Sequence, residues 1–421
     1  MSFLATASAT REAPSPSFLE FVLLVAIVMA LGSMSIDNLL PAFSLISSDY
    51  ALSHENEVQL VLTVYMVGFA LMQLVYGPIS DNVGRRPTLM IGLGIYAVGS
   101  LIALFAPSFE VLLVARFVQG LGAAATRVLA VAIVRDRYHG RDMARVMSIT
   151  MMVFIIVPVF APAIGSFFLL FGSWHAIFAS MLALALLIAV WFGRRMPETL
   201  HPQYRMPFSL PRIAAGAKRC VTDRATFGYA TAMGLMMGAL IGYIGSTQQV
   251  FETDVYAFGA MFPVVFGALA AGMGVASFVN SRLVRKLGMR RLSHTGVVGY
   301  AVSAALMVAV SLAFDGRPPF VLFIVPLAAC QFLFSLTMPN FNTMAMEAQG
   351  DIAGTASSVI GAYTTIAGAL LGMLVSQSFD GTVTPMALGF LLLGIAALAV
   401  VLWTEKGRLF RPHNPDPLPG T

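Results

Sequence analysis

The chain has 421 residues, of which 58% are hydrophobic and 11% are charged. Water-soluble domains carry about 25% charged residues, so this composition excludes an ordinary soluble protein. The formal net charge of +5 would suit a nucleic acid partner. We predict no such partner, because the distribution of charge along a membrane protein explains the excess better.

Twelve apolar segments follow one another along the chain, each long enough to cross a bilayer as a helix. They lie at residues 18–43, 57–77, 88–106, 109–134, 146–170, 175–193, 225–248, 257–280, 294–314, 319–342, 357–379 and 384–403. Arg11 and the first segment resemble a signal peptide, but the segment is too long for one, and we expect it to be retained. The sequence therefore predicts an all-α integral membrane protein with twelve transmembrane helices.

Positive charges are distributed unevenly between the two predicted sides of the membrane. With a cytoplasmic N-terminus, 22 of the 25 Lys and Arg residues fall in cytoplasmic loops and tails, and the external loops contain only Arg317. Cytoplasmic loops of membrane proteins are enriched in Lys and Arg. The sequence therefore predicts a multi-pass protein of the bacterial inner membrane, in contact with the lipid bilayer, with both termini in the cytoplasm.

The longest polar stretch, residues 194–224, lies midway along the chain and predicts a cytoplasmic linker. It would join two pseudo-symmetric six-helix bundles at 18–193 and 225–403, with cytoplasmic tails at 1–17 and 404–421. A faint repeat supports this division, because the GRR sequence at 84–86 is echoed by GMRR at 288–291. Two such bundles with a cavity between them at the midplane are typical of transporters.

Three charged residues lie well inside predicted spans, away from the first turns: Asp37 in the first helix, and Arg116 and Arg127 in the fourth. Each costs at least about 2.5–3.5 kcal/mol at the centre of a membrane. They could pair simply to hold the bundle together. Alternatively, Asp37 binds a proton or cation, while Arg116 modulates its proton affinity or binds substrate. Arg127 lies about 16 Å nearer the cytoplasm, where snorkelling to the surface is the favoured explanation.

The basic turn after the second segment, residues 77–87, is the strongest motif. Gly77 lets a neighbouring helix approach closely, and Gly84 allows a tight turn. Asp81 can accept hydrogen bonds from the N-terminal amides of another helix. The arginines of this turn can pair with an acid on an adjacent loop, and the residues expected to do so are Arg85, Arg86 and Asp136.

This turn resembles the signature loop of the major facilitator superfamily. Residues 116–122 (RFVQGLG) resemble the fourth-helix motif of this family, and residues 161–165 (APAIG) resemble its fifth-helix antiporter motif. Residues 37–42 (DNLLPA) are similar to the acidic first-helix motif of the drug exporters in the family. Residues 339–340 and 353–357 resemble the corresponding region of the Bcr/CflA multidrug exporters. The resemblance spans nearly the whole chain and points to the drug:proton antiporters.

The resemblance implies proton-coupled efflux of small amphipathic or hydrophobic drug-like compounds by alternating access. It implies a monomeric secondary transporter, not an enzyme, driven by the proton gradient without cofactor or metal. Asp37 and Arg116 would couple the proton, and the signature loop would latch the outward-facing state. The fifth-helix motif, represented by Pro158, Pro162 and Gly165, would let that helix flex or stop ion leakage. Arg285 stands where the second half would need an acid, so we expect the latch mainly in the first half.

Helices one, four, seven and ten would line the substrate cavity. Polar side chains in these regions could anchor substrate, or could simply form hydrogen bonds between helices; they are Asn38, Tyr65, Gln119, Tyr229, Gln248, Gln331 and Tyr363. The nearest alternatives are a proton symporter that imports its substrate and an exporter of one specific metabolite. A non-transporting sensor or scaffold is less consistent with loops of only about 30 residues, and no paired catalytic groups indicate an enzyme.

Overall fold

The computed structural model describes residues 16–410, and helices make up most of this part of the chain. The predicted tails and Arg11 therefore lie largely or wholly outside the described residues. The long helices of the first half are α1 (Phe18–Asp37), α3 (Leu60–Val83), α4 (Arg85–Leu104), α5 (Phe109–Arg137), α6 (Gly140–Leu169) and α7 (His175–Arg195). Those of the second half are α9 (Arg224–Gln248), α10 (Phe262–Leu287), α11 (Met289–Ala313), α12 (Phe320–Met346), α13 (Ala353–Gln377) and α14 (Thr384–Thr404).

Within residues 16–410, eleven helical segments are long and apolar enough to cross a membrane. They correspond to eleven of the twelve predicted spans. The remaining long helix, α6, has a shorter apolar stretch at Ile156–Leu169, because its first turns contain charged residues such as Asp142 and Arg145. The structure therefore confirms a multi-pass helical membrane protein.

The first apolar segment is not one continuous helix. The α1 helix ends at Asp37, a 3₁₀ turn follows at Leu40–Ala42, and the short helix α2 (Phe43–Asp49) completes the segment. Pro41 lies in this turn, and proline has no backbone N–H to continue an α-helical ladder. The break leaves Asp37 and Asn38 at a helix end, deep in the protein.

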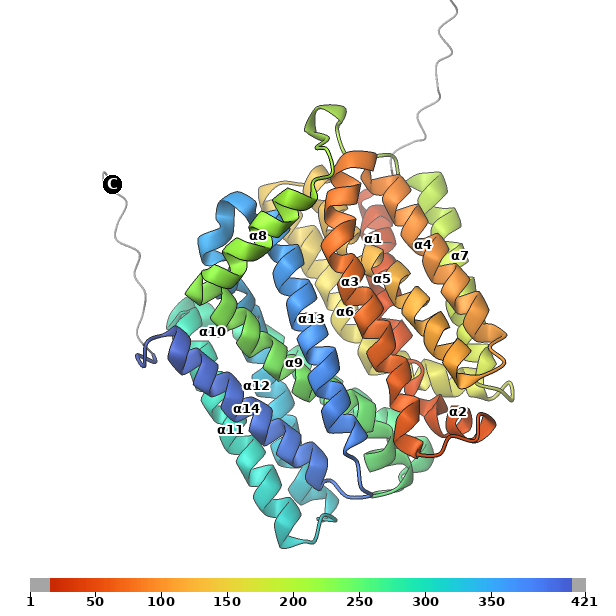
Figure 1. The fold of residues 1–421 in the computed structure, drawn as a ribbon, viewed down its shortest axis with the longest axis vertical. Helices are drawn as coiled ribbons and strands as arrows, with labels where there is room; N and C mark the ends of the chain where they lie inside the picture. Colours follow the sequence, from red (N-terminus) through yellow and green to blue (C-terminus); the bar gives the residue numbers. More distant parts are fainter. Residues whose placement is uncertain (1–15, 411–421) are drawn as a thin grey trace, which may run out of the picture.

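The long helices pack in two groups that follow the chain order. Helices α1 and α3–α7 pack on one another, as do α9–α14, and the two groups meet where α3 contacts α13 and where α6 contacts α10. Figure 1 shows the two groups side by side, with the linker helix α8 (Leu210–Thr222) crossing one end of the second. Helix α8 packs on α13 and α9.

Small residues allow the close packing around α5. A Cβ atom on Gly120 would lie 2.1 Å from the carbonyl oxygen of Tyr65 on α3, and one on Gly92 of α4 would lie 2.2 Å from the Cβ of Ala125. Helices in lipid associate through such close backbone contact, because burial from water does not drive them together. The helix α5 is therefore fixed between α3 and α4, as Figure 1 shows.

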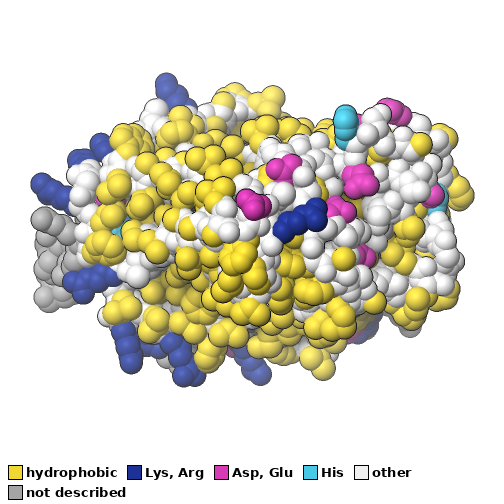
Figure 2. Space-filling view, turned by 90° about the horizontal axis from the view of Figure 1, so that it is seen from below, with side chains coloured by type: hydrophobic (Ala, Val, Ile, Leu, Met, Phe, Trp, Pro, Cys, Tyr) yellow, Lys and Arg dark blue, Asp and Glu magenta, His cyan; other side chains and the backbone are white. Residues whose placement is uncertain are grey.

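The outer surface and the two ends of the molecule differ in character. Large exposed apolar side chains occur on most helices, such as Leu101, Leu186, Val275, Leu306 and Val325, as a lipid-facing surface requires. The end seen in Figure 2 has several acidic side chains around one basic side chain. The connections at that end contain Glu55, Glu57, Asp254, Asp315 and Asp380, but Arg317 as their only Arg or Lys.

Candidate functional site

Arg116 is wholly buried in α5 and joins three helices. Its guanidinium donates to the carbonyl oxygen of Ser35 on α1 at 2.9 Å and to that of Val61, in the first turn of α3, at 3.1 Å. It also donates to Gln119 Oε1 and lies 4.4 Å from the centre of the Tyr65 ring. All of these partners are neutral. The positive charge is therefore stabilised by carbonyl dipoles and an aromatic face, with no carboxylate in contact with it.

Asp37 is the last residue of α1 and is only 5% exposed. It forms no hydrogen bond or ion pair with any residue that the structure describes. The simple pairing of Asp37 with Arg116, one of the two alternatives left by the sequence, is therefore absent. A buried carboxylate without a counter-ion is costly and is relieved by taking up a proton or a cation.

Asn38 lies next to this carboxyl group and is also wholly buried. Neither its Oδ1 nor its Nδ2 atom has a hydrogen-bond partner among the residues that the structure describes. Gly165 of α6 is the reason for the tight packing here, because a Cβ atom on it would lie 2.1 Å from the Asn38 carbonyl oxygen. The first-helix and fifth-helix motifs thus meet at this point. The buried, unpaired amide leaves a donor and an acceptor beside Asp37 for water or substrate.

Tyr65 and Gln119 use their polar atoms within the first half. The Tyr65 hydroxyl donates to the Gly32 carbonyl oxygen of α1 at 3.1 Å. Gln119 Nε2 donates to Ser100 Oγ of α4 at 2.8 Å. Both side chains are wholly buried and connect helices. They therefore form hydrogen bonds between helices, which is one of the two roles that the sequence left open.

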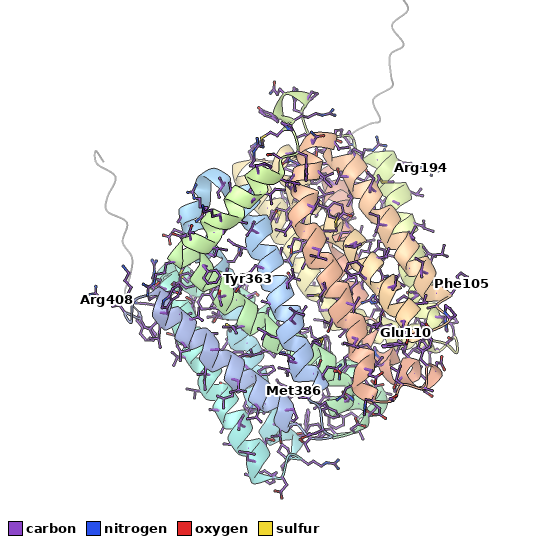
Figure 3. All side chains as sticks on the ribbon, in the orientation of Figure 1. Phe105, Glu110, Arg194, Tyr363, Met386 and Arg408 are labelled. Carbon is purple, nitrogen blue, oxygen red and sulfur yellow. The ribbon has the colours of Figure 1, made fainter. Side chains whose placement is uncertain are left out.

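The four candidates in the second half are spread over its length. Tyr229 donates to the Glu405 carboxylate beyond the end of α14, and Gln248 Nε2 lies 3.4 Å from Ser44 Oγ of the first half. Gln331 is 2% exposed, and its Nε2 has no partner. Tyr363, marked in Figure 3, is 36% exposed, and its hydroxyl lies 3.1 Å from Thr231 Oγ1.

The signature loop is built around Arg85, whose side chain is only 4% exposed. Its Nε atom lies 2.8 Å from Asp136 Oδ2 at the end of α5, so the predicted ion pair with Asp136 is present. Its Nη1 atom lies 2.5 Å from Asp81 Oδ1 and donates to Ser80 Oγ. Asp81 is therefore paired with an arginine of its own loop. The predicted contact with the N-terminus of another helix is not what this structure shows.

Glu198, which follows α7, is a member of this cluster that the sequence analysis missed. Its carboxylate accepts from the backbone N–H groups of Arg85 at 2.9 Å and Arg86 at 3.1 Å, at the start of α4. A negative charge at a helix N-terminus is stabilised by the unpaired amides and the helix dipole. Gly84 has a φ of 121°, and a Cβ atom there would lie 2.5 Å from Glu198 Oε2. Glycine is required both by the turn and by the carboxylate.

The second half has a corresponding cluster of ion pairs, although Arg285 stands where Asp81 lies in the first half. Arg290 Nε lies 2.9 Å from Glu405 Oε1, and its Nη2 lies 3.8 Å from Glu347 Oε2. Glu347 follows α12 and Glu405 follows α14, much as Asp136 and Glu198 lie near the ends of α5 and α7. Gly288, with a φ of 78°, corresponds to Gly84. The repeat in sequence thus reflects a repeat in ion pairing.

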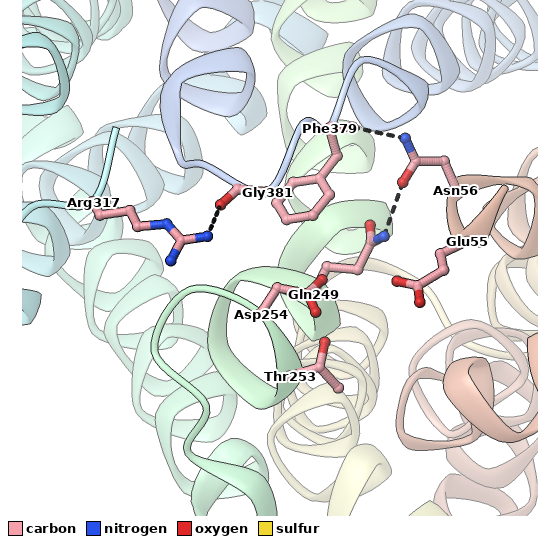
Figure 4. A pocket seen from close by; sticks show the side chains of 8 residues that line it. All are labelled: Glu55, Asn56, Gln249, Thr253, Asp254, Arg317, Phe379 and Gly381. Carbon is pink, nitrogen blue, oxygen red and sulfur yellow. Dashed lines mark hydrogen bonds between the residues drawn. The ribbon is translucent and has the colours of Figure 1, made fainter. Parts of the chain in front are cut away.

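Amide side chains connect the two halves at the opposite, acidic end. Asn56 Nδ2 donates to the carbonyl oxygens of Gln377 at 3.0 Å and Phe379 at 2.9 Å. Gln249 Nε2 donates to Asn56 Oδ1 at 2.8 Å, and Gln59 Nε2 donates to Gln249 Oε1 at 2.6 Å. Figure 4 shows part of this network at a pocket that also includes Glu55, Thr253, Asp254, Arg317 and Gly381. We call Asn56, Gln59, Gln249 and Gln377 the amide clasp.

Comparison with known proteins gives consistent matches along most of the chain. The family model described as Major Facilitator Superfamily matches residues 23–372. A bicyclomycin resistance protein homolog of Haemophilus influenzae is 30% identical, over 87% of this chain and 91% of its own length. Multidrug resistance protein D of Escherichia coli is 27% identical, over 91% of this chain and 95% of its own. A crystal structure of a D-xylose-proton symporter is similar in fold, with a TM-score of 0.72, 16% identity and coverage of 94% of this chain and 100% of the other.

Proposed function

The chain belongs to the Major Facilitator Superfamily, and we propose that it is a secondary active transporter that exports small amphipathic or hydrophobic compounds in exchange for protons. The family match covers most of the chain. Two relatives that match over most of their length are named for resistance to bicyclomycin and to multiple drugs. These names agree with the motif resemblance to drug exporters and support a drug-like substrate.

In this proposal α6 also crosses the bilayer, which gives twelve spans in two bundles at residues 18–193 and 225–403, joined by the linker 194–224. Both termini lie in the cytoplasm of a bacterial cell, and the protein resides in the inner membrane. The acidic connections at one end and the basic loops at the other support this orientation, because Lys and Arg remain on the cytoplasmic side. The protein acts as a monomer without cofactor.

The observation that carries the proposal is the buried Asp37 carboxyl group without a cation beside it. A proton from the external side neutralises it, and release of that proton to the cytoplasm leaves a charge that the site must compensate. Substrate binding next to Asp37, at the unpaired Asn38 amide, competes with the protonated state. Arg116 is a positioning residue in this scheme, because it holds the Ser35 carbonyl oxygen, two residues before Asp37.

The membrane potential supplies a useful part of the energy. One proton moving inward across 100 mV releases about 2.3 kcal/mol. Since about 1.4 kcal/mol corresponds to a factor of ten in concentration, this concentrates a neutral substrate several tens-fold. A pH gradient adds to this driving force, so coupling through one carboxyl group suffices for efflux.

Asp37→Asn tests the proposal. The asparagine has nearly the same shape but cannot exchange a proton, so we expect export driven by a pH gradient to fall to the level of empty vesicles. The measurement is substrate flux in vesicles of defined orientation, with and without a protonophore. The control is Asp315→Asn, which removes an exposed acid from the loop between α11 and α12 and should leave export unchanged. Undiminished proton-driven export by Asp37→Asn would refute the assignment, and uptake in place of export would indicate a symporter.

A further inference from the structure

The proposed proton exchange assigns no role to Arg127, a charged residue of α5. It lies eleven residues after Arg116, about three helical turns, so the two side chains leave the helix in nearly the same direction. On this face Arg116, Ala123 and Val134 are wholly buried. Val114, which is 58% exposed, points about 140° away. The direction of Arg127 is therefore inward, not toward the surface on which Val114 lies.

Contacts of neighbouring residues on α5 define this direction further. A Cβ atom on Gly32 of α1 would lie 3.3 Å from Thr126 Oγ1, and Gly120 touches α3 at Tyr65. The opposite face of α5 packs on α4 through Gly122 and Ala125. Arg127 therefore points between α1 and α3, away from α4.

Arg127 is exposed, although Arg116 and Ala123 on the same face of α5 are wholly buried. These two observations agree if the side chain faces a water-accessible space within the protein. Snorkelling, the explanation suggested by the sequence, would require the side chain to reach the helix end at Arg137. That end is ten residues away, or about 15 Å, which is farther than an arginine side chain extends.

Arg127 has no partner among the described residues that would neutralise it. It forms no hydrogen bond, ion pair or cation–π contact with any described residue. The acids at the basic-loop ends of α5 and α1 are engaged by other arginines: Asp136 pairs with Arg85, and Glu20 in the first turn of α1 pairs with Arg195 at 2.6 Å. An unpaired charge in such surroundings is costly unless water or a bound anion compensates it.

We propose that Arg127 lines the substrate cavity and binds an acidic group of the exported compound, so that the preferred substrates are amphipathic anions. This inference rests on the proposed export function and specifies its substrate class. A guanidinium is always charged, and its fork of N–H donors fits the oxygens of a carboxylate, sulfonate or phosphate. Apolar side chains of the surrounding helices would accommodate the rest of the molecule.

The position of Arg127 along the membrane suits this role. It lies on the basic-loop side of Arg116, so a substrate that enters from the cytoplasm meets it first. An anion that leaves and a proton that enters both transfer charge in the direction that a potential negative inside favours. Proton exchange at Asp37 and anion binding at Arg127 therefore act together in export.

Two dyes that differ by one sulfonate group test the proposal: 1-anilinonaphthalene-8-sulfonate, an anion, and its uncharged parent N-phenyl-1-naphthylamine. Binding of both is measured with the full-length protein in lipid nanodiscs, and empty nanodiscs give the background. We expect Arg127→Gln to weaken binding of the anion about ten-fold or more, as loss of a charged hydrogen-bond partner does, and to leave the neutral dye within about two-fold. Arg127→Lys should keep most of the anion preference.

The matched control is Arg135→Gln, which removes an exposed arginine from the same helix, two turns nearer its end, and should not change the preference. Near-equal binding of the two dyes by the unaltered protein, or an anion preference that survives Arg127→Gln, would overturn the inference. These results do not depend on flux. If the anion preference depends on Arg127 while no variant shows pH-driven export, the site is supported and the proposed export function is what fails.

Discussion

The two ends of the molecule are held by different kinds of bond. At the end with the basic loops, charged groups form the clusters around Arg85 and Arg290, and each of these clusters lies within one half of the chain. At the acidic end, the amide clasp consists of neutral side chains and crosses from one half to the other. Asn56 and Gln59 come from the first half, and Gln249 and Gln377 come from the second.

The difference follows from what each end must do if the halves move against each other. An ion pair that is partly buried is strongly destabilising to break, because it leaves a charge without a partner. A neutral hydrogen bond contributes only about 1 kcal/mol, since water can replace either partner. The charged clusters therefore preserve each half as a rigid unit, whereas the amide clasp can open and close. Alternating access needs both properties.

The largest effect expected from breaking this pattern is that of Arg85→Met. The substitution keeps an apolar stem but leaves Asp81 and Asp136 without their cation, and Arg85 is only 4% exposed. We expect the free energy of unfolding to fall by about 3–5 kcal/mol. Arg290→Met should cost less, about 2–3 kcal/mol, because Arg290 is 18% exposed and its partners Glu405 and Glu347 are 17% and 49% exposed.

Unfolding of the purified protein by heat or detergent measures both losses. Arg86→Met is the control, because it removes a neighbouring positive charge whose side chain donates to the Gly193 carbonyl oxygen, while its backbone N–H still donates to Glu198. Equal losses for the Arg85 and Arg290 variants would show that the two clusters do not differ in strength. Normal stability of Arg85→Met would remove the distinction between rigid halves and a movable clasp.

A smaller effect is expected from weakening the amide clasp. Asn56→Ala removes the donor to Gln377 and Phe379 and the acceptor for Gln249. Gln249→Ala removes the bond to Asn56 and the acceptor for Gln59. Each should favour opening of the acidic end by roughly five-fold, the equivalent of about 1 kcal/mol. A cysteine at Ser47, which lines a pocket there, reports this opening by its rate of alkylation with a membrane-impermeant maleimide.

The background for this measurement has both native cysteines, Cys220 and Cys330, replaced by serine. Thr382→Ala is the matched control, because the Thr382 hydroxyl bonds to Asp380 within the same loop and does not cross between halves. The double variant of Asn56 and Gln249 should show less than the sum of the two single effects, since the residues share a bond. Unchanged alkylation in all three clasp variants would mean that other contacts hold this end closed.

Local sequence patterns were sufficient for much of the fold and for part of the site. An apolar segment that is long enough to cross a bilayer predicts a spanning helix, and eleven of the predicted spans agree with the structure. The pairing of Arg85 with Asp136 was also predictable, because the two residues lie in neighbouring loops on the same side of the membrane. The departures are local too: Pro41 divides the first segment, and polar residues shorten the apolar part of α6.

Contacts between distant parts of the chain were not predictable in this way. Asn56 meets Gln377 more than 300 residues away, and an amide in a loop gives no local indication of its partner. Glu198 was missed for the same reason, because its role as a cap depends on how α7 ends beside α4. Arg116 was expected beside Asp37, but backbone carbonyl groups satisfy it instead. Carbonyl groups are present at every position, so a sequence cannot show which ones are accessible.

The smallest expected effect is the pH dependence of stability that Glu405 contributes in the cluster around Arg290. Burial acts to raise the pKa of the Glu405 carboxyl group, but hydrogen bonds from Tyr229 and Arg290 outweigh it and place the pKa below the ordinary value of 4.5. A carboxyl group with a lowered pKa contributes stability above its unfolded pKa, and this contribution is lost as the pH falls through the folded value. The unaltered protein should therefore be more stable than Glu405→Gln at pH 7, with a difference that shrinks below about pH 4.5. Thermal unfolding of both proteins between pH 7 and pH 3.5 measures this, and a difference that stays constant or grows on acidification would show that Glu405 acts through packing and not through its charge.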